Sequence, residues 1–158
     1  MRSEQATLLE SVSAAFPRGS KQFTMTLRQG NQRDSYREPT PDAVPLDWRD
    51  VSDGELEDHH WGLTHLDPPS WLFYLPAFLS YSVRHPSRGE SLVISACVNN
   101  LRPPDRVPSR FKLLSSAQRQ AAVAVLDFLA FDSESQFQSD ACQALEEYWI
   151  ERPLYPDT

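Results

Sequence analysis

The stretch Leu72-Phe73-Tyr74-Leu75-Pro76-Ala77-Phe78-Leu79 decides the fold of this chain. Leu72, Leu75, Phe78 and Leu79 recur every three to four residues, and Ser82 continues the same face, which is the spacing of an α-helix. Asp67 is a favoured residue type for the N-cap position, and Pro68 is favoured at the first helical position that follows it. The sequence therefore predicts a central helix that opens at Asp67-Pro68 and supplies the middle of the core.

Pro76 is the unusual residue of this helix. A proline in a helix interior lacks the N–H that would bond the carbonyl four residues earlier, which here belongs to Leu72. We therefore expect the helix to be kinked at Pro76 or divided into two pieces there.

Further helices are predicted on both sides of the central one. Their signals are apolar residues at helical spacing, capping residues and helix-ending Pro or Gly. Ser115 and Gln118 form a capping box that opens one of them, and Gly62 is expected to end another. The expected helices cover residues 4–16, 54–60 and 90–101, a segment opened by Ser115, and a segment from Asp132 or Ser133 to Ile150.

Residues 18–52 form the least regular part of the chain. Phe23, Met25 and Leu27 alternate with polar residues, which suits a short strand, although the same residues could lead into a brief helix over 27–36. Three prolines between residues 39 and 45 exclude regular structure there. Trp48 is expected to anchor the segment to the core.

These elements predict a mainly α fold, a single compact bundle of five or six helices over residues 1–158. A chain of 158 residues fits one domain, and residues 18–52 form its irregular segment. The apolar tail 151–158 is expected to pack back on the domain. No apolar run approaches the roughly 20 residues of a membrane span, and no secretory signal is visible, so we expect a cytoplasmic protein.

The charge of the chain is acidic and unevenly distributed. The formal net charge is −7; residues 53–67 hold five acids and no Lys or Arg, and residues 113–158 hold eight acids against two basic residues. Nucleic-acid binding is not expected, because phosphate contacts need a concentrated basic face. Acidic faces can instead attract a basic protein.

Four motifs together carry a resemblance to a known family. They are Asp47-Trp48 before an acidic short helix, Leu66-Asp67-Pro68, Tyr74-Leu75-Pro76-Ala77-Phe78-Leu79, and Leu114-Ser115-x-x-Gln118. Over roughly residues 5–131 the chain resembles a small bacterial domain-of-unknown-function family with a central Tyr-Leu-Pro-Ala-Phe helix. The resemblance implies a helical fold and no particular activity; by analogy with other small bacterial domains it points to an accessory or toxin-neutralising role.

Two sets of residues are candidates for chemistry. Glu55 and His59 lie four residues apart on one helical face, and with His65 they could share a divalent metal. The spacing matches no established metal motif, so an acidic solvated helix is the competing interpretation and no cofactor is expected. Cys97 and Cys142 are interpreted as reduced thiols, and Cys97 lies in an apolar run where burial would make it a poor nucleophile.

A basic cluster follows the helix over 90–101. It consists of Arg102, Arg106, Arg110 and Lys112 among prolines. We expect a solvated connector, or pairing with the acidic C-terminal helix, in preference to a phosphate site.

The function favoured by the sequence is non-enzymatic protein binding. Acidic residues with aromatic neighbours would engage a more basic protein, such as a toxin or effector, as an immunity protein, inhibitor or accessory factor does. The alternatives are a small metal-dependent or hydrolytic enzyme built on Glu55, His59 and His65, and a structural or oligomerisation domain. The partner-binding candidates are Glu55, Glu57, Asp58, Trp61, Glu146, Glu147 and Trp149.

Overall fold

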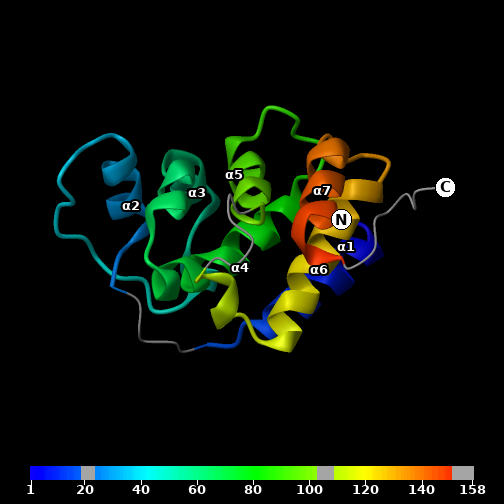
Figure 1. Cartoon of the computed structure of the whole chain (residues 1–158), viewed down its shortest axis with the longest axis horizontal. Coiled ribbons are helices and arrows are strands. Elements are labelled where there is room, and N and C mark those ends of the chain that lie inside the picture. The colour runs from blue at the N-terminus through cyan, green and yellow to red at the C-terminus, as the bar shows by residue number, and fades with distance from the viewer. Residues whose placement is uncertain (19–23, 103–108, 151–158) are drawn as a thin grey trace.

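Helix α4 (Pro68–Arg84) is the centre of the core, and other helices pack around it (Figure 1). The computed structural model describes residues 1–18, 24–102 and 109–150. Every residue from Phe73 to Val83 is buried, as in a helix covered on all sides. Helices α1 (Ser3–Ala15), α5 (Leu92–Asn100) and α6 (Ser116–Phe131) pack against α4.

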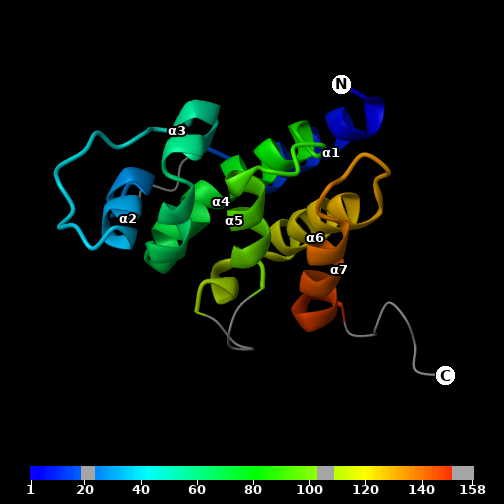
Figure 2. The same cartoon turned by 90° about the horizontal axis from the view of Figure 1, so that it is seen from above.

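The remaining elements lie at two ends of the molecule. Helices α2 (Leu27–Asp34) and α3 (Asp53–Asp58) occupy one end, and α7 (Gln138–Ala144) lies at the other, beyond α5 (Figures 1 and 2). The described residues contain seven α-helices and no strand, which confirms the mainly α class. Short helical turns complete the fold: η1 (Trp48–Asp50), η2 (His60–His65), η3 (Phe111–Leu113) and the π-helical η4 (Leu145–Trp149).

The central helix begins as the sequence predicts. Asp67 is its N-cap residue, and its carboxylate accepts hydrogen bonds from Ser70 Oγ at 2.6 Å and from Thr24 Oγ1 at 3.1 Å. The helix is continuous through Pro76, so a division into two pieces is wrong, and a bend at Pro76 stays a prediction. The neighbouring helices hold this proline in a buried position.

A short strand was expected around residues 23–27. The described residues of this segment form no strand, so the prediction is wrong for them, and Phe23 lies outside the described residues. Thr26 instead caps α2: its hydroxyl accepts from Gln29 N at 3.2 Å, and Gln29 Oε1 accepts from Thr26 N at 2.9 Å. This reciprocal pair is a capping box, and it favours a helix over the alternating pattern. The brief helix considered for 27–36 is therefore the correct alternative.

The C-terminal helix begins at Gln138, so the expected start at Asp132 or Ser133 is wrong. Asp132 ends α6, and its carboxylate accepts a hydrogen bond from Glu134 N at 3.1 Å in a turn. Buried Ser135 donates its hydroxyl to Leu129 O at 2.5 Å, which ties this turn to α6. The tail 151–158 lies outside the described residues, so its packing stays a prediction.

Gly62 was expected to end the helix over residues 54–60. This prediction is wrong, because α3 already stops at Asp58. It lies in η2, where an added Cβ would meet the backbone carbonyl of Leu27 in α2. A Cβ on Gly30 would in turn meet the carbonyl of Gly62. The two glycines let the backbones of α2 and η2 approach closely.

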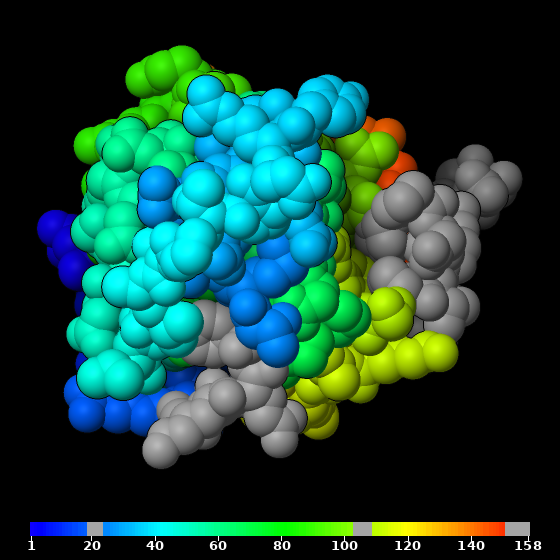
Figure 3. All heavy atoms as spheres, turned by 90° about the vertical axis from the view of Figure 1, so that its left-hand side faces the viewer, coloured from blue at the N-terminus to red at the C-terminus, as the bar shows by residue number. Residues whose placement is uncertain are grey.

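Trp48 anchors its segment as predicted. Its indole N–H donates to Phe16 O at 2.8 Å, and the Arg49 guanidinium lies over its ring at 4.5 Å. Between α2 and η1 the chain covers the end of the molecule that faces the viewer in Figure 3.

Candidate functional site

The acidic partner-binding candidates of α3 lie beside the last turns of α4. Tyr81 Oη donates to Glu57 Oε1 at 3.0 Å, and Arg88 Nη1 lies 3.6 Å from the same carboxylate oxygen. Glu57 is therefore held by partners within the chain. Glu55 and Asp58 are exposed to solvent.

Trp61 is a weaker surface candidate than the sequence indicates. It is half-buried, packs against the core and meets the His60 ring edge-on, with 4.8 Å between ring centroids. Its main role is therefore to stabilise the packing of η2 and the end of α3, with contact to a partner second.

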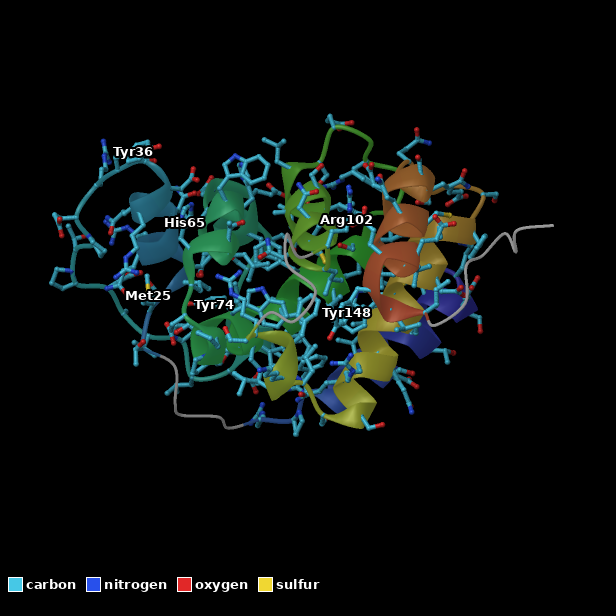
Figure 4. All side chains as sticks on the ribbon, in the orientation of Figure 1. Met25, Tyr36, His65, Tyr74, Arg102 and Tyr148 are labelled. Atoms are coloured by element: carbon cyan, nitrogen blue, oxygen red, sulfur yellow. The ribbon has the colours of Figure 1, made fainter. Side chains whose placement is uncertain are left out.

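The C-terminal candidates lie on η4. Glu147 accepts two hydrogen bonds from Arg102 (labelled in Figure 4), at 3.0 Å from Nε and 2.9 Å from Nη2, which confirms for this arginine the expected pairing with the acidic C-terminal helix. Arg110 of the same cluster instead donates to the carbonyls of Thr64 and Leu66. Arg106, in the same cluster, lies outside the described residues. Trp149 is half-buried and donates its indole N–H to Leu101 O at 2.8 Å, whereas Glu146 is exposed.

The two groups of candidates do not form one site. In both Figure 1 and Figure 2, α5 lies between α3 and α7, so the acids of α3 and those of η4 face different parts of the surface. A partner of ordinary size would use one group or the other as its main contact.

The candidate metal ligands Glu55, His59 and His65 are not assembled into a site. His65 Nε2 lies 2.9 Å from Asp34 Oδ1, an interaction with α2 that directs this imidazole away from a shared ion. Across residues 1–18, 24–102 and 109–150, no three His, Cys, Asp or Glu side chains are placed to hold a metal.

Both cysteines are free thiols in the structure. Cys97 is fully buried, and burial raises its pKa to about 12 against a smaller lowering by a hydrogen bond with Ser82. A thiol with this pKa is not ionised at neutral pH, so Cys97 is unsuited to nucleophilic catalysis.

Two recesses with both apolar and charged lining lie beside α6. One hollow of about 400 Å³ lies between α6 and Trp149, and a second of about 380 Å³ lies between α6 and α1. Both are lined by Ala124 and Asp127, so these two residues of α6 lie between the two hollows. We call their union the α6 groove, lined by Glu4, Thr7, Leu8, Ser11, Ser116, Arg119, Gln120, Val123, Ala124, Asp127, Phe128 and Trp149.

The floor of the α6 groove is apolar. Leu8 of α1, Val123 of α6 and Trp149 of η4 are all partly buried and packed against the core. Arg119 lies at one side with its guanidinium already engaged: Nη2 donates to Tyr148 Oη at 3.1 Å and Nη1 to Phe111 O at 3.2 Å. This arginine stacks 5.3 Å from the Trp149 ring centroid and fixes its position.

Two exposed acids, Glu4 and Asp127, line the α6 groove, together with the cationic Arg119. Burial raises the pKa of the Cys142 thiol, and the negative charges of Glu146 and Asp127 raise it further. Of the predicted candidates, the structure brings Trp149 to this groove, whereas Glu146 is exposed on η4 and is not one of the lining residues.

The residues that α6 contributes were missed by sequence reasoning. The inward face of α6 consists of apolar residues at helical spacing, among them Ala121, Ala122, Val125 and Leu126, which are buried. Val123 is an apolar residue on the opposite, outward side of the same helix. Its position was the one sequence signal that the outward side of α6 also has an apolar part. The flanking positions of α1 and η4 come from the fold alone.

The fold and these surfaces define the class: a mainly helical domain with a groove lined by apolar residues and exposed acids. None of its described helices is long and apolar enough to cross a bilayer. The chain belongs to a family of unknown function, DUF6714, whose model matches residues 4–153. This confirms the resemblance to a domain of unknown function. Comparison with curated proteins finds no match, and comparison with solved structures finds none either.

Proposed function

We propose that this protein is a non-enzymatic binding domain, an immunity-type inhibitor or accessory factor of a bacterial cell. Its partner is a more basic protein, and the α6 groove is its binding surface. The observation that carries the proposal is that two neighbouring hollows beside α6 combine partly buried apolar residues with exposed acids.

The groove suits an amphipathic helix of the partner. Recognition of this kind places apolar residues of one helix face into a groove between helices, with anchors three to four residues apart. Helix α6 has 16 residues, and at about 1.5 Å per residue it offers roughly 24 Å of length. Lys or Arg residues beside the anchors would meet Glu4 and Asp127.

The charge argues against a second copy of this chain as the occupant. The protein carries a formal charge of −7, and the exposed acids of the groove placed against an equally acidic surface are repelled. Self-association through the groove is therefore disfavoured, and this separates the binding proposal from an oligomerisation domain.

A site-specific photo-crosslinking experiment tests the proposal. A photoreactive amino acid at Gln120, exposed in the groove, is compared with one at Leu92, exposed on α5 away from it. In the native host, Gln120 is expected to capture a basic protein through a segment with apolar residues at helical spacing and flanking Lys or Arg. Equal capture at Leu92, or crosslinks to a second copy of the chain, would overturn the proposal.

A further inference from the structure

A proline-rich segment between α2 and η1 forms an extended strap on the surface. Residues 37–45 form no helix, turn or bend. The three prolines, Pro39, Pro41 and Pro45, fix their own φ angles, and the residue before each of them is confined to extended conformations. Both restrictions favour the polyproline II helix, which makes one turn in about three residues. We call residues 39–46 the proline strap; they belong to the part of the chain that covers the end of the molecule facing the viewer in Figure 3.

The burial of the proline strap repeats at every third residue. Pro39, Asp42 and Pro45 are half-buried, whereas the two residues between each pair of them are exposed. This is the period of a polyproline II helix that lies with one edge against the protein. The other two edges of the strap therefore face solvent.

Side chains of α2 and its cap hold the strap in place. Asp42 Oδ2 accepts a hydrogen bond from Thr26 Oγ1 at 2.7 Å, and Arg28 Nη1 lies 3.6 Å from Asp42 Oδ1. The Gln32 amide bonds Thr40 twice: Oε1 accepts from Thr40 N at 2.9 Å, and Nε2 donates to Thr40 Oγ1 at 2.9 Å. A ligand segment that is already ordered in this way avoids the conformational cost of binding.

The outward edges of the strap are apolar and uncharged. Pro41 and Val44 are three residues apart on one edge, and Ala43 and Leu46 follow the other. Val44 is 57% exposed and Leu46 91%. The one charged residue of the strap, Asp42, directs its carboxylate to Thr26. Neighbouring apolar side chains that stay exposed on a fixed backbone mark a protein interaction site.

We propose that the proline strap is a preformed ligand for a second protein, a domain with an aromatic-lined groove that accepts a polyproline II helix. Grooves of this kind recognise proline-containing segments by their extended shape, and aromatic rings pack against the outward side chains. The inference is independent of the proposed partner of the α6 groove, because α2 and α6 lie toward opposite ends of the molecule (Figures 1 and 2).

Photo-crosslinking of the full chain in an extract of its native host tests the proposal. A photoreactive amino acid at Ala43, exposed on the strap, should capture a protein, and mass spectrometry should place the crosslink in a segment of that protein that contains Trp or Tyr. A synthetic peptide of residues 37–47, added in excess, is the competitor and should abolish this capture.

Three substitutions in the chain that carries the crosslinker separate recognition from general charge. Val44→Lys and Leu46→Lys place an ammonium group on the outward edges and should reduce capture about tenfold, because an apolar groove does not accept an unpaired charge. Ser35→Lys adds the same charge at an exposed residue before the strap and should leave capture unchanged. The proposal is overturned by no capture at Ala43, by crosslinks to a second copy of the chain or to a segment without aromatic residues, by capture that the peptide does not compete, or by equal capture in the three variants.

Discussion

Tyr36 is the residue whose backbone fits its side chain least well. It has a φ of 59°, and its side chain is fully exposed at the edge of the molecule (Figure 4). Its N–H donates to Arg33 O at 3.0 Å and the N–H of Arg37 donates to Gln32 O at 2.8 Å, the two bonds of a Schellman motif. Glycine is the preferred residue at this position because a Cβ is strained there.

Tyr36→Gly should therefore stabilise the fold. Relative to Tyr36→Ala, which removes the ring but keeps the strain, the gain in the free energy of unfolding should be about 1 kcal/mol. Urea denaturation of both variants measures it. A glycine variant no more stable than the alanine variant would show that the left-handed conformation at this position is not strained.

The two cysteines should differ in reactivity. Iodoacetamide at pH 8 should modify half-buried Cys142 first and leave Cys97 unmodified until the protein unfolds, because Cys97 is buried and its pKa is about 12. Mass spectrometry of the labelled peptides with and without urea follows each site. Equal labelling of both thiols in the native protein contradicts the assigned burial.

Cys97 should also make stability fall at alkaline pH. A thiol ionises near pH 8.5 in the unfolded chain, whereas the folded pKa is about 12. Its contribution is present below the unfolded pKa, and it is lost between these two values as the unfolded state releases its proton first. Cys97→Ala should show a smaller loss of stability from pH 8 to pH 10 than the wild type, measured by urea unfolding.

At the scale of elements, the contact between α2 and η2 depends on two glycines. Gly62→Ala should cost up to about 3 kcal/mol, because its Cβ would meet a backbone carbonyl that cannot rotate away. Gly54→Ala in α3 is the control: its nearest atom is Ser52 Oγ at 3.8 Å, so a gain of about 0.5 kcal/mol from helix propensity is expected. Equal effects of the two substitutions on the unfolding midpoint would mean that α2 and η2 separate easily.

An element could be predicted from the sequence where neighbouring residues determine it, and could not where a contact with a distant segment determines it. The start of α4 at Asp67-Pro68 and the capping box at Ser115 are set by neighbouring residues, and both are confirmed. The start of α7 depends on Ser135 bonding back to Leu129 in α6, a tertiary contact with no local signal. The α6 groove is built from three separate segments, so of its lining residues only Trp149 was among the predicted candidates.

For the whole molecule, the distribution of charge matters more than its total. The basic residue Arg102 is neutralised internally by Glu147, and Arg119 is held by Tyr148 and Phe111 O. The acids Glu4 and Asp127 remain exposed beside the apolar lining residues of the groove. This combination is the basis for a basic amphipathic partner.

The most direct test of that claim is binding of a 14-residue amphipathic Leu/Lys helix, measured by fluorescence anisotropy of a labelled peptide. The wild type is compared with Asp127→Lys in the groove and with Glu90→Lys, at an exposed residue away from it. The two variants have the same net charge, so general attraction changes equally. A third variant, Asp58→Lys, carries the same change on α3.

We predict at least a tenfold weaker affinity for Asp127→Lys than for Glu90→Lys and Asp58→Lys, and no binding of the matching Leu/Glu peptide. Equal affinities for the three variants, or a loss confined to Asp58→Lys, would contradict the assignment of the α6 groove as the binding surface.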